Sequence, residues 1–192
     1  MQIHVLLAGA SGPGAGMGRL ECPTSFPGSM VSYQACTEIL QKFNLQFVRR
    51  TNEEDYIDIL SDQGCYSYVG RIGGGQVLSL ERNGCVFHHI IQHELLHALG
   101  FHHEQDRSDR DDHVRILLQN VIPGEEHNFD KVSTNNLNTP YDYNSVMHYS
   151  RFAFSRNQEP TILPIPDNNV PIGCATEMSP NDILRVNRLY CS

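Results

Sequence analysis

A histidine pair that encloses a glutamate is the part of this 192-residue sequence that most directly suggests chemistry. His93 and His97 stand on either side of Glu94 in residues 86–99, where the apolar pattern predicts a helix. Residues four apart lie on one face of a helix, one turn from each other, so both imidazoles can bind one cation. Glu94, about 100° further round the helix, lies close to that cation without being a ligand and can handle water.

A third ligand follows where this helix is expected to end. Gly100 can adopt the left-handed conformation that turns a chain sharply after a helix, and the turn returns His103 to the same cation. Three imidazoles leave one position open, which distinguishes a catalytic zinc site from a closed structural one. Zinc lowers the pKa of water at that position to roughly 7, so Glu94 can take its proton and pass it to a leaving amine. The sequence therefore predicts one Zn²⁺ per chain and hydrolysis of peptide bonds.

The remaining histidines need separate interpretation, because a single histidine on a helix is usually structural or solvent-facing. His89 and His93 also stand four apart, yet no glutamate follows His89, so only the register that begins at His93 supplies both ligands and a base. A purely structural zinc domain is disfavoured, because a closed site does not need Glu94. We assign no role to His88, His89, His102, His113 and His127.

Two longer runs of sequence make the pattern recognisable. They are His93-Glu94-x-x-His97-x-x-Gly100-Phe101-x-His103-Glu104, followed by Arg107-x-Asp109-Arg110-Asp111, and Ser145-Val146-Met147-His148-Tyr149. The first resembles the zinc motif of the astacin family of metzincin metalloproteases, and the second resembles the Met-turn of that family with its tyrosine. The similarity covers residues 31–192 and is closest to fish hatching enzymes and their relatives over residues 47–59, 134–154 and 164–173.

The resemblance implies roles for individual side chains. The zinc ligands would be His93, His97 and His103, with Glu94 as the general base. Met147 would form an apolar floor beneath the metal, a role compatible with an ordinary core methionine. Tyr149 would be a displaceable extra ligand whose hydroxyl donates to the oxyanion of the tetrahedral intermediate.

Glu104 and one strand complete what the resemblance implies. In the family, removal of a propeptide frees an N-terminus that is buried against the glutamate matching Glu104. Glu104 therefore needs this ammonium group or another cation as its partner. The strand at residues 66–70 would form the upper rim of the cleft, where an extended substrate pairs by backbone hydrogen bonds.

Six cysteines indicate an oxidising compartment, and none stands in a Cys-x-x-Cys spacing. The resemblance implies a disulfide between Cys65 and Cys85, which flank a glycine-rich hairpin. Relatives usually pair a cysteine near the C-terminus, here Cys191, with one just before the strand at residues 47–49, but this sequence has Asn44 there. The candidate partners of Cys191 are Cys22, Cys36 and Cys174, and four cysteines permit three connectivities.

The predicted elements fall into two parts. Residues 1–30 are rich in Gly, Ser and Pro without periodicity, and we expect them to be loosely ordered. We predict a helix at residues 31–43, strands at 45–49, 56–60, 66–69 and 77–80, and, in a half with little sheet, a short helix at 114–120. A final helix is marked by Ser179 as N-cap, Pro180 at the first position and Asp182 in the first turn.

The composition excludes several classes of protein. Asp and Glu outnumber Lys and Arg by 22 to 14, and a net charge of −8 argues against nucleic acid as a partner. No apolar stretch reaches the length of a membrane-spanning helix. Residues 3–10 form only a weak signal sequence, because no Lys or Arg precedes them. We expect a secreted, monomeric protein whose signal peptide is weak or missing in this chain.

Together these patterns predict an α+β protein with the two-lobed zincin or metzincin fold. An astacin-like peptidase domain would span residues 31–192, with lobes at about 31–100 and 101–192, after the atypical segment 1–30. A twisted mixed sheet with helices would form the first lobe, and an irregular chain with a final helix the second. We predict a zinc endopeptidase that cleaves extracellular polypeptides, such as egg-envelope glycoproteins. The alternative is a catalytically impaired, secreted zinc-binding protein that lacks the usual N-terminal elements.

Overall fold

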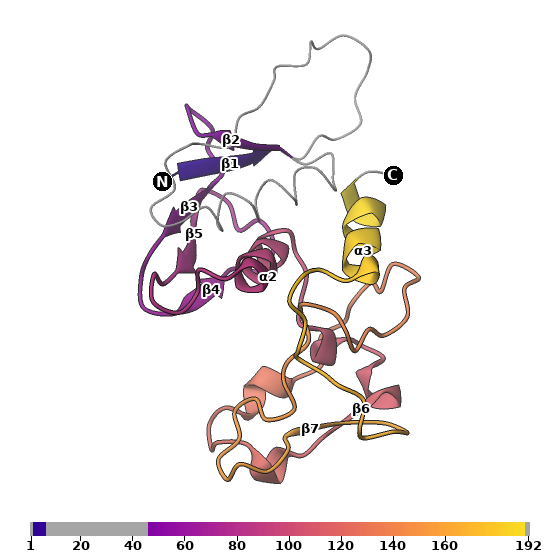
Figure 1. The fold of residues 1–192 in the computed structure, drawn as a ribbon. Coiled ribbons are helices and arrows are strands. Elements are labelled where there is room, and N and C mark those ends of the chain that lie inside the picture. Colours follow the sequence, from indigo (N-terminus) through magenta and orange to yellow (C-terminus); the bar gives the residue numbers. More distant parts are fainter. Residues whose placement is uncertain (1, 7–45, 191–192) are drawn as a thin grey trace. The chain divides into compact units, whose positions relative to one another are not determined.

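The computed structural model describes residues 2–6 and 46–190 (Figure 1). The chain divides into two compact units, residues 1–101 with 186–192 and residues 102–185. The helix predicted at residues 31–43 and most of the segment 1–30 lie outside the described residues. The predicted domain bounds, 1–30 and 31–192, therefore remain a proposal.

A five-stranded mixed sheet forms the framework of the first unit (Figure 1). Its strands are β1 (Gln2–Leu6), β2 (Gln46–Arg49), β3 (Tyr56–Leu60), β4 (Cys65–Ser67) and β5 (Gly75–Leu80), in the order β2-β1-β3-β5-β4. Only β3 and β5 pair in parallel, with Ile57 opposite Gln76, and the other neighbours are antiparallel. The predicted strands β2 to β5 are thus confirmed. The sequence did not predict β1, because its apolar run also fits a weak signal sequence and only pairing with the distant β2 and β3 makes it a strand.

The helix α2 (His88–Ala98) contacts β4 and β5, and its packing buries the apolar face on which its position depends. Ile91, Leu95 and Leu96 are buried on α2, and Leu78 and Leu80 are buried on β5. Full burial of such side chains contributes about 1.5–3 kcal/mol each. The Cys65–Cys85 disulfide links β4 to the loop before α2. The helix that carries the histidine pair is therefore fixed both by packing and by a covalent bond.

The unit of residues 102–185 is mostly irregular, as predicted, and contains a two-stranded sheet and four 3₁₀ turns among its described residues. The strands are β6 (Val114–Ile116) and β7 (Ile162–Pro164), and the turns are Glu104–Asp106, Arg110–Asp112, Leu118–Asn120 and Glu126–Phe129. The short helix predicted at residues 114–120 was wrong. Val114 and Ile116 are β-branched residues that pair with β7, and only the last three residues form a 3₁₀ turn.

The final helix α3 (Pro180–Tyr190) begins as the sequence predicted. The backbone N–H of Asp182 donates to Ser179 Oγ at 3.0 Å, and the backbone N–H of Ser179 donates to Asp182 Oδ2 at 3.0 Å. This reciprocal cap satisfies two backbone donors that a helix start leaves unpaired, and such a cap contributes about 1 kcal/mol. Within residues 2–6 and 46–190, no helix has both the length and the apolar character that crossing a membrane requires.

Candidate zinc site

His93 and His97 lie one turn apart on α2 and direct their ring nitrogens at each other. Their Nε2 atoms are 3.1 Å apart, and the two rings are nearly perpendicular. The Nδ1 of His97 lies 2.8 Å from the carbonyl oxygen of Phe101, which can only accept a hydrogen bond. Nδ1 of His97 is therefore protonated, and its Nε2 keeps a lone pair for a cation.

The turn after α2 has the geometry expected from its glycine. Gly100 has a φ of +95°, its N–H donates to the His97 carbonyl at 2.8 Å, and the N–H of Phe101 donates to the Leu96 carbonyl at 3.0 Å. These two bonds form a Schellman motif, in which the left-handed residue is usually glycine. The predicted helix end at Gly100 is confirmed.

His103 completes a cluster with the two histidines of α2. One ring nitrogen from each of His93, His97 and His103 can be chosen so that all three lie within 4.8 Å of one another. The Nδ1 of His103 is 3.4 Å from a carboxylate oxygen of Asp106, an arrangement that orients a ligating imidazole from behind. The structure thus brings together the three ligands predicted from the sequence.

Glu94 is 5% exposed, and its Oε2 has no hydrogen-bond partner among the described residues. Burial raises the pKa of Glu94 to about 7. A buried oxygen without a partner is costly unless a water or a cation meets it. Three converging imidazoles, one of them on the residue before this buried acid, are a donor set that fits a zinc ion with a water molecule, so the residues present match the predicted cofactor.

Met147 lies in a turn that is bound to the residue after His103. The backbone N–H of Met147 donates to Ser145 Oγ at 3.0 Å, and the Met147 carbonyl accepts the N–H of Glu104 at 3.0 Å. Ser145 Oγ donates in turn to Asp182 Oδ1 at 2.6 Å. The Met147 side chain is buried. Its role as an apolar floor beneath the metal stays a prediction.

Tyr149 is half-buried, and its ring centroid lies 4.3 Å from that of His103. Its backbone N–H donates to Gln105 Oε1 at 3.0 Å, and its carbonyl accepts the Nδ1–H of His148 at 2.8 Å. The hydroxyl of Tyr141 donates to the other ring nitrogen of His148 at 2.8 Å. Burial lowers the pKa of His148 to about 4, so this histidine is neutral at pH 7. The backbone of Tyr149 is therefore held at both its polar atoms.

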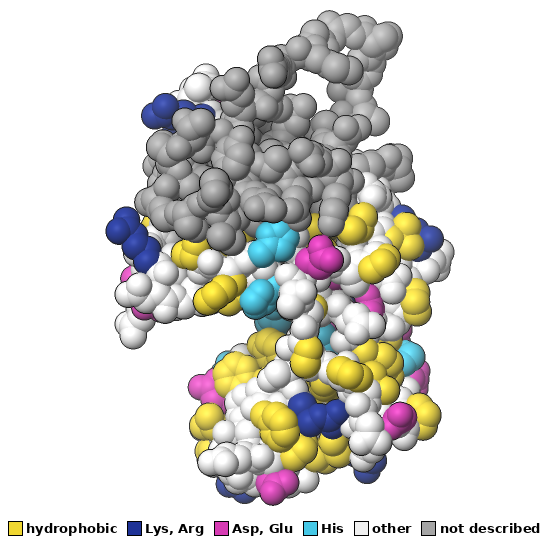
Figure 2. Space-filling view, viewed as in Figure 1, with side chains coloured by type: hydrophobic (Ala, Val, Ile, Leu, Met, Phe, Trp, Pro, Cys, Tyr) yellow, Lys and Arg dark blue, Asp and Glu magenta, His cyan; other side chains and the backbone are white. Residues whose placement is uncertain are grey.

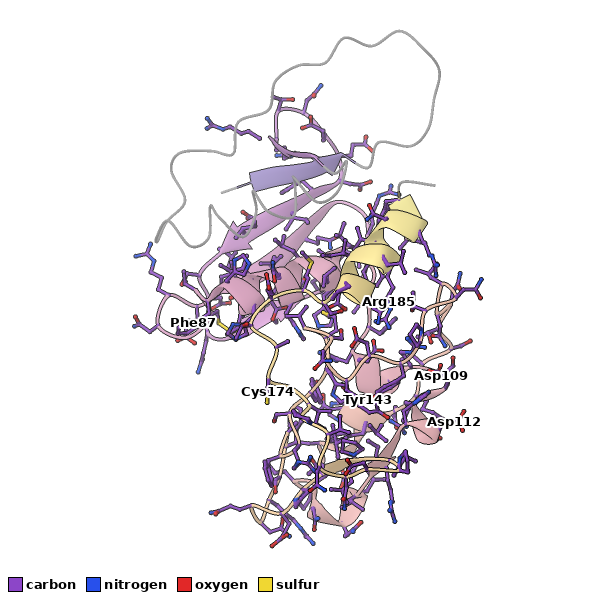
Figure 3. All side chains as sticks on the ribbon, turned by 45° about the vertical axis from the view of Figure 1, so that its right-hand side comes forward. Phe87, Asp109, Asp112, Tyr143, Cys174 and Arg185 are labelled. Atoms are coloured by element: carbon purple, nitrogen blue, oxygen red, sulfur yellow. A yellow bond between two sulfur atoms is a disulfide. The ribbon has the colours of Figure 1, made fainter. Side chains whose placement is uncertain are left out.

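Glu104 is 2% exposed and is paired with two arginines. Arg185 of α3 (Figure 3) binds both of its carboxylate oxygens, at 2.5 and 2.9 Å, and Arg107 binds Oε1 at 3.2 Å. The backbone N–H of Asp142 also donates to Oε1, at 2.7 Å. Burial raises the pKa of Glu104, and the two guanidinium groups oppose that rise. The cation that Glu104 needs is supplied by Arg185 and Arg107.

Sequence reasoning gave no role at this site to Arg185, Arg107 or Gln105. Arg185 lies 81 residues from Glu104 in the sequence, so no local spacing reveals their ion pair. Asp182 was predicted only as a first-turn residue of the final helix, although it also binds the turn of Met147. No signal in a single sequence identifies such contacts.

The remaining predicted residues lie in other parts of the structure. The Cys65–Cys85 disulfide implied by the resemblance is present, and Cys174 (Figure 3) is exposed with a free thiol. Cys22, Cys36 and Cys191 lie outside the described residues, so their pairing stays open. Four of the histidines to which we assigned no role have structural contacts. His88 binds Gln92, His89 stacks on Phe87, His113 stacks on Tyr141 and His127 binds the Gly124 carbonyl.

Comparisons with known proteins agree with this geometry. Residues 28–191 match the family model for astacin, which is described as a peptidase family. High choriolytic enzyme 2 of Oryzias latipes is 60% identical over 147 residues, which are 76% of this chain and 53% of that protein. Low choriolytic enzyme of the same fish is 52% identical over 156 residues, which are 81% of this chain and 58% of that protein. This chain therefore spans little more than half the length of these two relatives.

A solved structure is similar over most of the chain. It is that of High choriolytic enzyme 1, a hatching enzyme zinc-protease from Oryzias latipes, with a TM-score of 0.79 and 53% sequence identity. The likeness covers 87% of this chain and 86% of that one. The predicted α+β fold is confirmed by this likeness.

Proposed function

Because this chain belongs to the astacin family of zinc metalloproteases, we propose that it is an endopeptidase that hydrolyses peptide bonds in extracellular polypeptides. The proposal is carried by the convergence of three imidazoles, together with the buried Oε2 of Glu94, the residue after His93. This oxygen has no hydrogen-bond partner among the described residues. A structural zinc site would fill its fourth position with a protein ligand and has no use for an acid at that place.

The zinc ion supplies a Lewis acid and lowers the pKa of the attacking water to roughly 7. His93, His97 and His103 would hold this ion. Glu94 takes the proton of the attacking water on a carboxylate oxygen and then donates it to the leaving amine. Its burial favours this role, because desolvation raises the pKa of the carboxylate in the metal-free chain and so makes it a stronger base than an exposed glutamate.

Tyr149 is proposed to donate its hydroxyl proton in a hydrogen bond to the oxyanion of the tetrahedral intermediate. Its ring lies next to the ring of His103, which is where such a donor is needed. Gln105 and His148 hold the Tyr149 backbone while the side chain remains half-buried. The two backbone contacts fix the position from which the Tyr149 side chain extends beside His103.

The substrate is proposed to lie along β4 as an added strand. Among the described strands, β4 is at the edge of its sheet, with β5 as its one neighbour. Tyr66, Tyr68 and Val69 expose apolar side chains on and just after this strand. An extended peptide that pairs with an edge strand gains affinity from backbone hydrogen bonds, so many sequences can bind.

The natural substrate is proposed to be an egg-envelope glycoprotein, and the protein a secreted monomer. The names of the similar choriolytic enzymes support the first part. Six cysteines and the Cys65–Cys85 disulfide support secretion. On the face drawn in Figure 2, the Lys and Arg side chains of the described residues are scattered, so that face has no basic patch for nucleic acid.

The test is cleavage of casein or gelatin by the purified full chain. We expect cleavage, its loss with a chelator and its return with zinc. Glu94→Gln should bind one zinc per chain and cleave at least 100-fold more slowly, about the contribution of general base catalysis. The control is Glu126→Gln, which changes an exposed acid and should leave the rate unchanged. Zinc binding without cleavage by the unmodified chain would favour the catalytically impaired alternative.

The substrate proposal needs its own comparison. We expect isolated fish egg envelopes to be solubilised by the unmodified chain but not by Glu94→Gln at the same concentration. Cleavage of casein without any effect on the envelopes would support the proposed peptidase activity and contradict the proposed egg-envelope substrate.

A further inference from the structure

Arg185 is a buried arginine whose guanidinium donors nearly all have a hydrogen-bond acceptor. It is 7% exposed, and its donors bind Thr139 Oγ1 at 2.8 Å, the Pro140 carbonyl at 2.9 Å and both carboxylate oxygens of Glu104. The guanidinium group cannot lose its charge in a protein, so burial is tolerated only with acceptors placed in this way. The planar fork of Arg185 thereby fixes Glu104 in position as well as neutralising it.

Glu104 is joined to the zinc site through the backbone, because it directly follows the ligand His103. Its carboxylate accepts hydrogen bonds from Arg185, Arg107 and the Asp142 N–H, and its own N–H donates to the Met147 carbonyl. Both the side chain and the main chain of Glu104 are thus immobilised. A shift of Glu104 would move the His103 backbone with it.

The same helix also holds the turn that contains Met147. Asp182 lies one turn before Arg185 on α3, and it accepts the hydroxyl of Ser145 at 2.6 Å and the N–H of Val146 at 3.0 Å. The first half of α3 therefore binds both segments that meet at the Glu104–Met147 hydrogen bond. Arg185 is the member of this set that reaches the residue next to a zinc ligand.

We propose that Arg185 is a positioning residue for His103, which it holds in place through the Glu104 carboxylate. This inference rests on the proposed zinc site. It explains how Glu104 is neutralised by the chain's own side chains, because Arg185 forms a two-pronged ion pair that a single ammonium group cannot form. A positive charge alone is then not sufficient to hold Glu104 and His103 in place, and the planar shape of the guanidinium group is also required.

The test measures metal binding and does not depend on cleavage. The full chain and its variants Arg185→Gln and Arg185→Lys are titrated with zinc against a chromophoric chelator, and their cobalt complexes are examined by visible absorption. We expect Arg185→Gln to bind zinc about 10- to 100-fold more weakly, the usual effect of removing an outer-shell partner, and to change the cobalt spectrum. Arg185→Lys should fall between this variant and the unmodified chain, because lysine keeps the charge but not the fork.

Arg188→Gln is the matched control, because it removes an exposed arginine from the same helix. It should leave both the zinc affinity and the cobalt spectrum unchanged. If Arg185→Gln does not fold, as judged by circular dichroism, the comparison of Arg185→Lys with the unmodified chain decides. The inference would be overturned if the folded Arg185 variants kept the zinc affinity and cobalt spectrum of the unmodified chain. An equal change in Arg188→Gln would overturn it as well. A chain that binds zinc through Arg185-dependent geometry but cleaves nothing would refute the proposed function and leave this inference standing.

Discussion

The helix α2 and the irregular unit of residues 102–185 each bury one glutamate near the zinc cluster, and they treat it in opposite ways. Glu94 on α2 leaves one carboxylate oxygen without a hydrogen-bond partner among the described residues. Glu104 accepts four hydrogen bonds, three from arginines and one from a backbone N–H. An unsatisfied carboxylate is available to move a proton, whereas a saturated one is fixed and holds its neighbours. The difference is consistent with the chemical role proposed for Glu94 and with an architectural role for Glu104.

The two regions also differ in the interactions that fix the positions of their zinc-site residues. The positions of His93 and His97 follow from the period of one helix and from apolar side chains of that same helix. Glu104, the residue after His103, is held by a network within residues 139–147 and 182–185, which come together only in the folded chain. Substitutions in the second region should therefore cost more folding free energy than comparable ones in the first.

Glu104→Gln should have the largest effect on stability. The substitution removes the negative charge that Arg185 and Arg107 share. Arg107 keeps Asp109, but the buried guanidinium group of Arg185 is left with only Asp182, at 3.9 Å, as a counterion. Breaking a buried ion pair in this way costs about 3–5 kcal/mol. Urea unfolding of the metal-free full chain measures the free energy of unfolding, and Glu126→Gln at an exposed position serves as control. A loss below about 1 kcal/mol would mean that the network does not hold this unit together.

Asp182→Ala should rank second, at about 2 kcal/mol. Its carboxylate accepts hydrogen bonds from the Ser145 hydroxyl and from the N–H groups of Val146 and Ser179, and alanine leaves these buried donors unpaired. Asp112→Ala removes an exposed aspartate of the same unit and should change the unfolding free energy by less than about 0.5 kcal/mol. Equal effects of the two substitutions would contradict a structural role for the contact between α3 and the turn of Met147.

Gly100→Ala should have a smaller effect, about 1–2 kcal/mol. A Cβ at this position has room, since its nearest neighbour would be 3.9 Å away, so the cost comes from the positive φ alone. Gly84→Ala is the control, because a Cβ there also has room and the backbone is not left-handed. Thermal unfolding of both variants gives the comparison. A fully stable Gly100→Ala protein would show that the turn does not depend on glycine.

Glu94→Gln should have the smallest effect on stability, although we expect it to slow cleavage strongly. The substitution takes a poorly satisfied charge out of a buried position, so the metal-free chain should keep its unfolding free energy within about 1 kcal/mol or gain slightly. Urea unfolding beside Glu104→Gln compares the same chemical change at two buried glutamates. If Glu94→Gln lost as much unfolding free energy as Glu104→Gln, the proposed difference between the two glutamates would be wrong.

The sequence predicted best what short-range spacing determines. The α2 helix, its end at Gly100 and the cap of α3 by Ser179 and Asp182 depend on residues within a few positions of each other, and all three are present. The zinc ligands could be predicted for the same reason, because residues 93–103 contain all three ligand histidines and Gly100. Strand β3 has buried residues at alternate positions, a pattern that its sequence also carries.

Long-range pairing explains what the sequence did not predict. Residues 114–116 are a strand because β7, at residues 162–164, lies opposite them, whereas their local pattern also fits a helix. Strand β1 depends in the same way on β2 and β3. The ion pair of Arg185 with Glu104 joins residues 81 positions apart and leaves no local trace. Buried polar networks of this kind are visible only when the fold is known.

The most direct test of the zinc site is X-ray absorption at the zinc edge of the metal-loaded full chain. We expect one zinc per chain, with three imidazole nitrogens at about 2.0–2.1 Å and the remaining coordination from oxygen, either of water or of the displaceable Tyr149 hydroxyl. The same spectrum from His103→Ala should lose one imidazole. A site with only two imidazoles, or one closed by a thiolate sulfur at about 2.3 Å, would contradict the proposed catalytic zinc site.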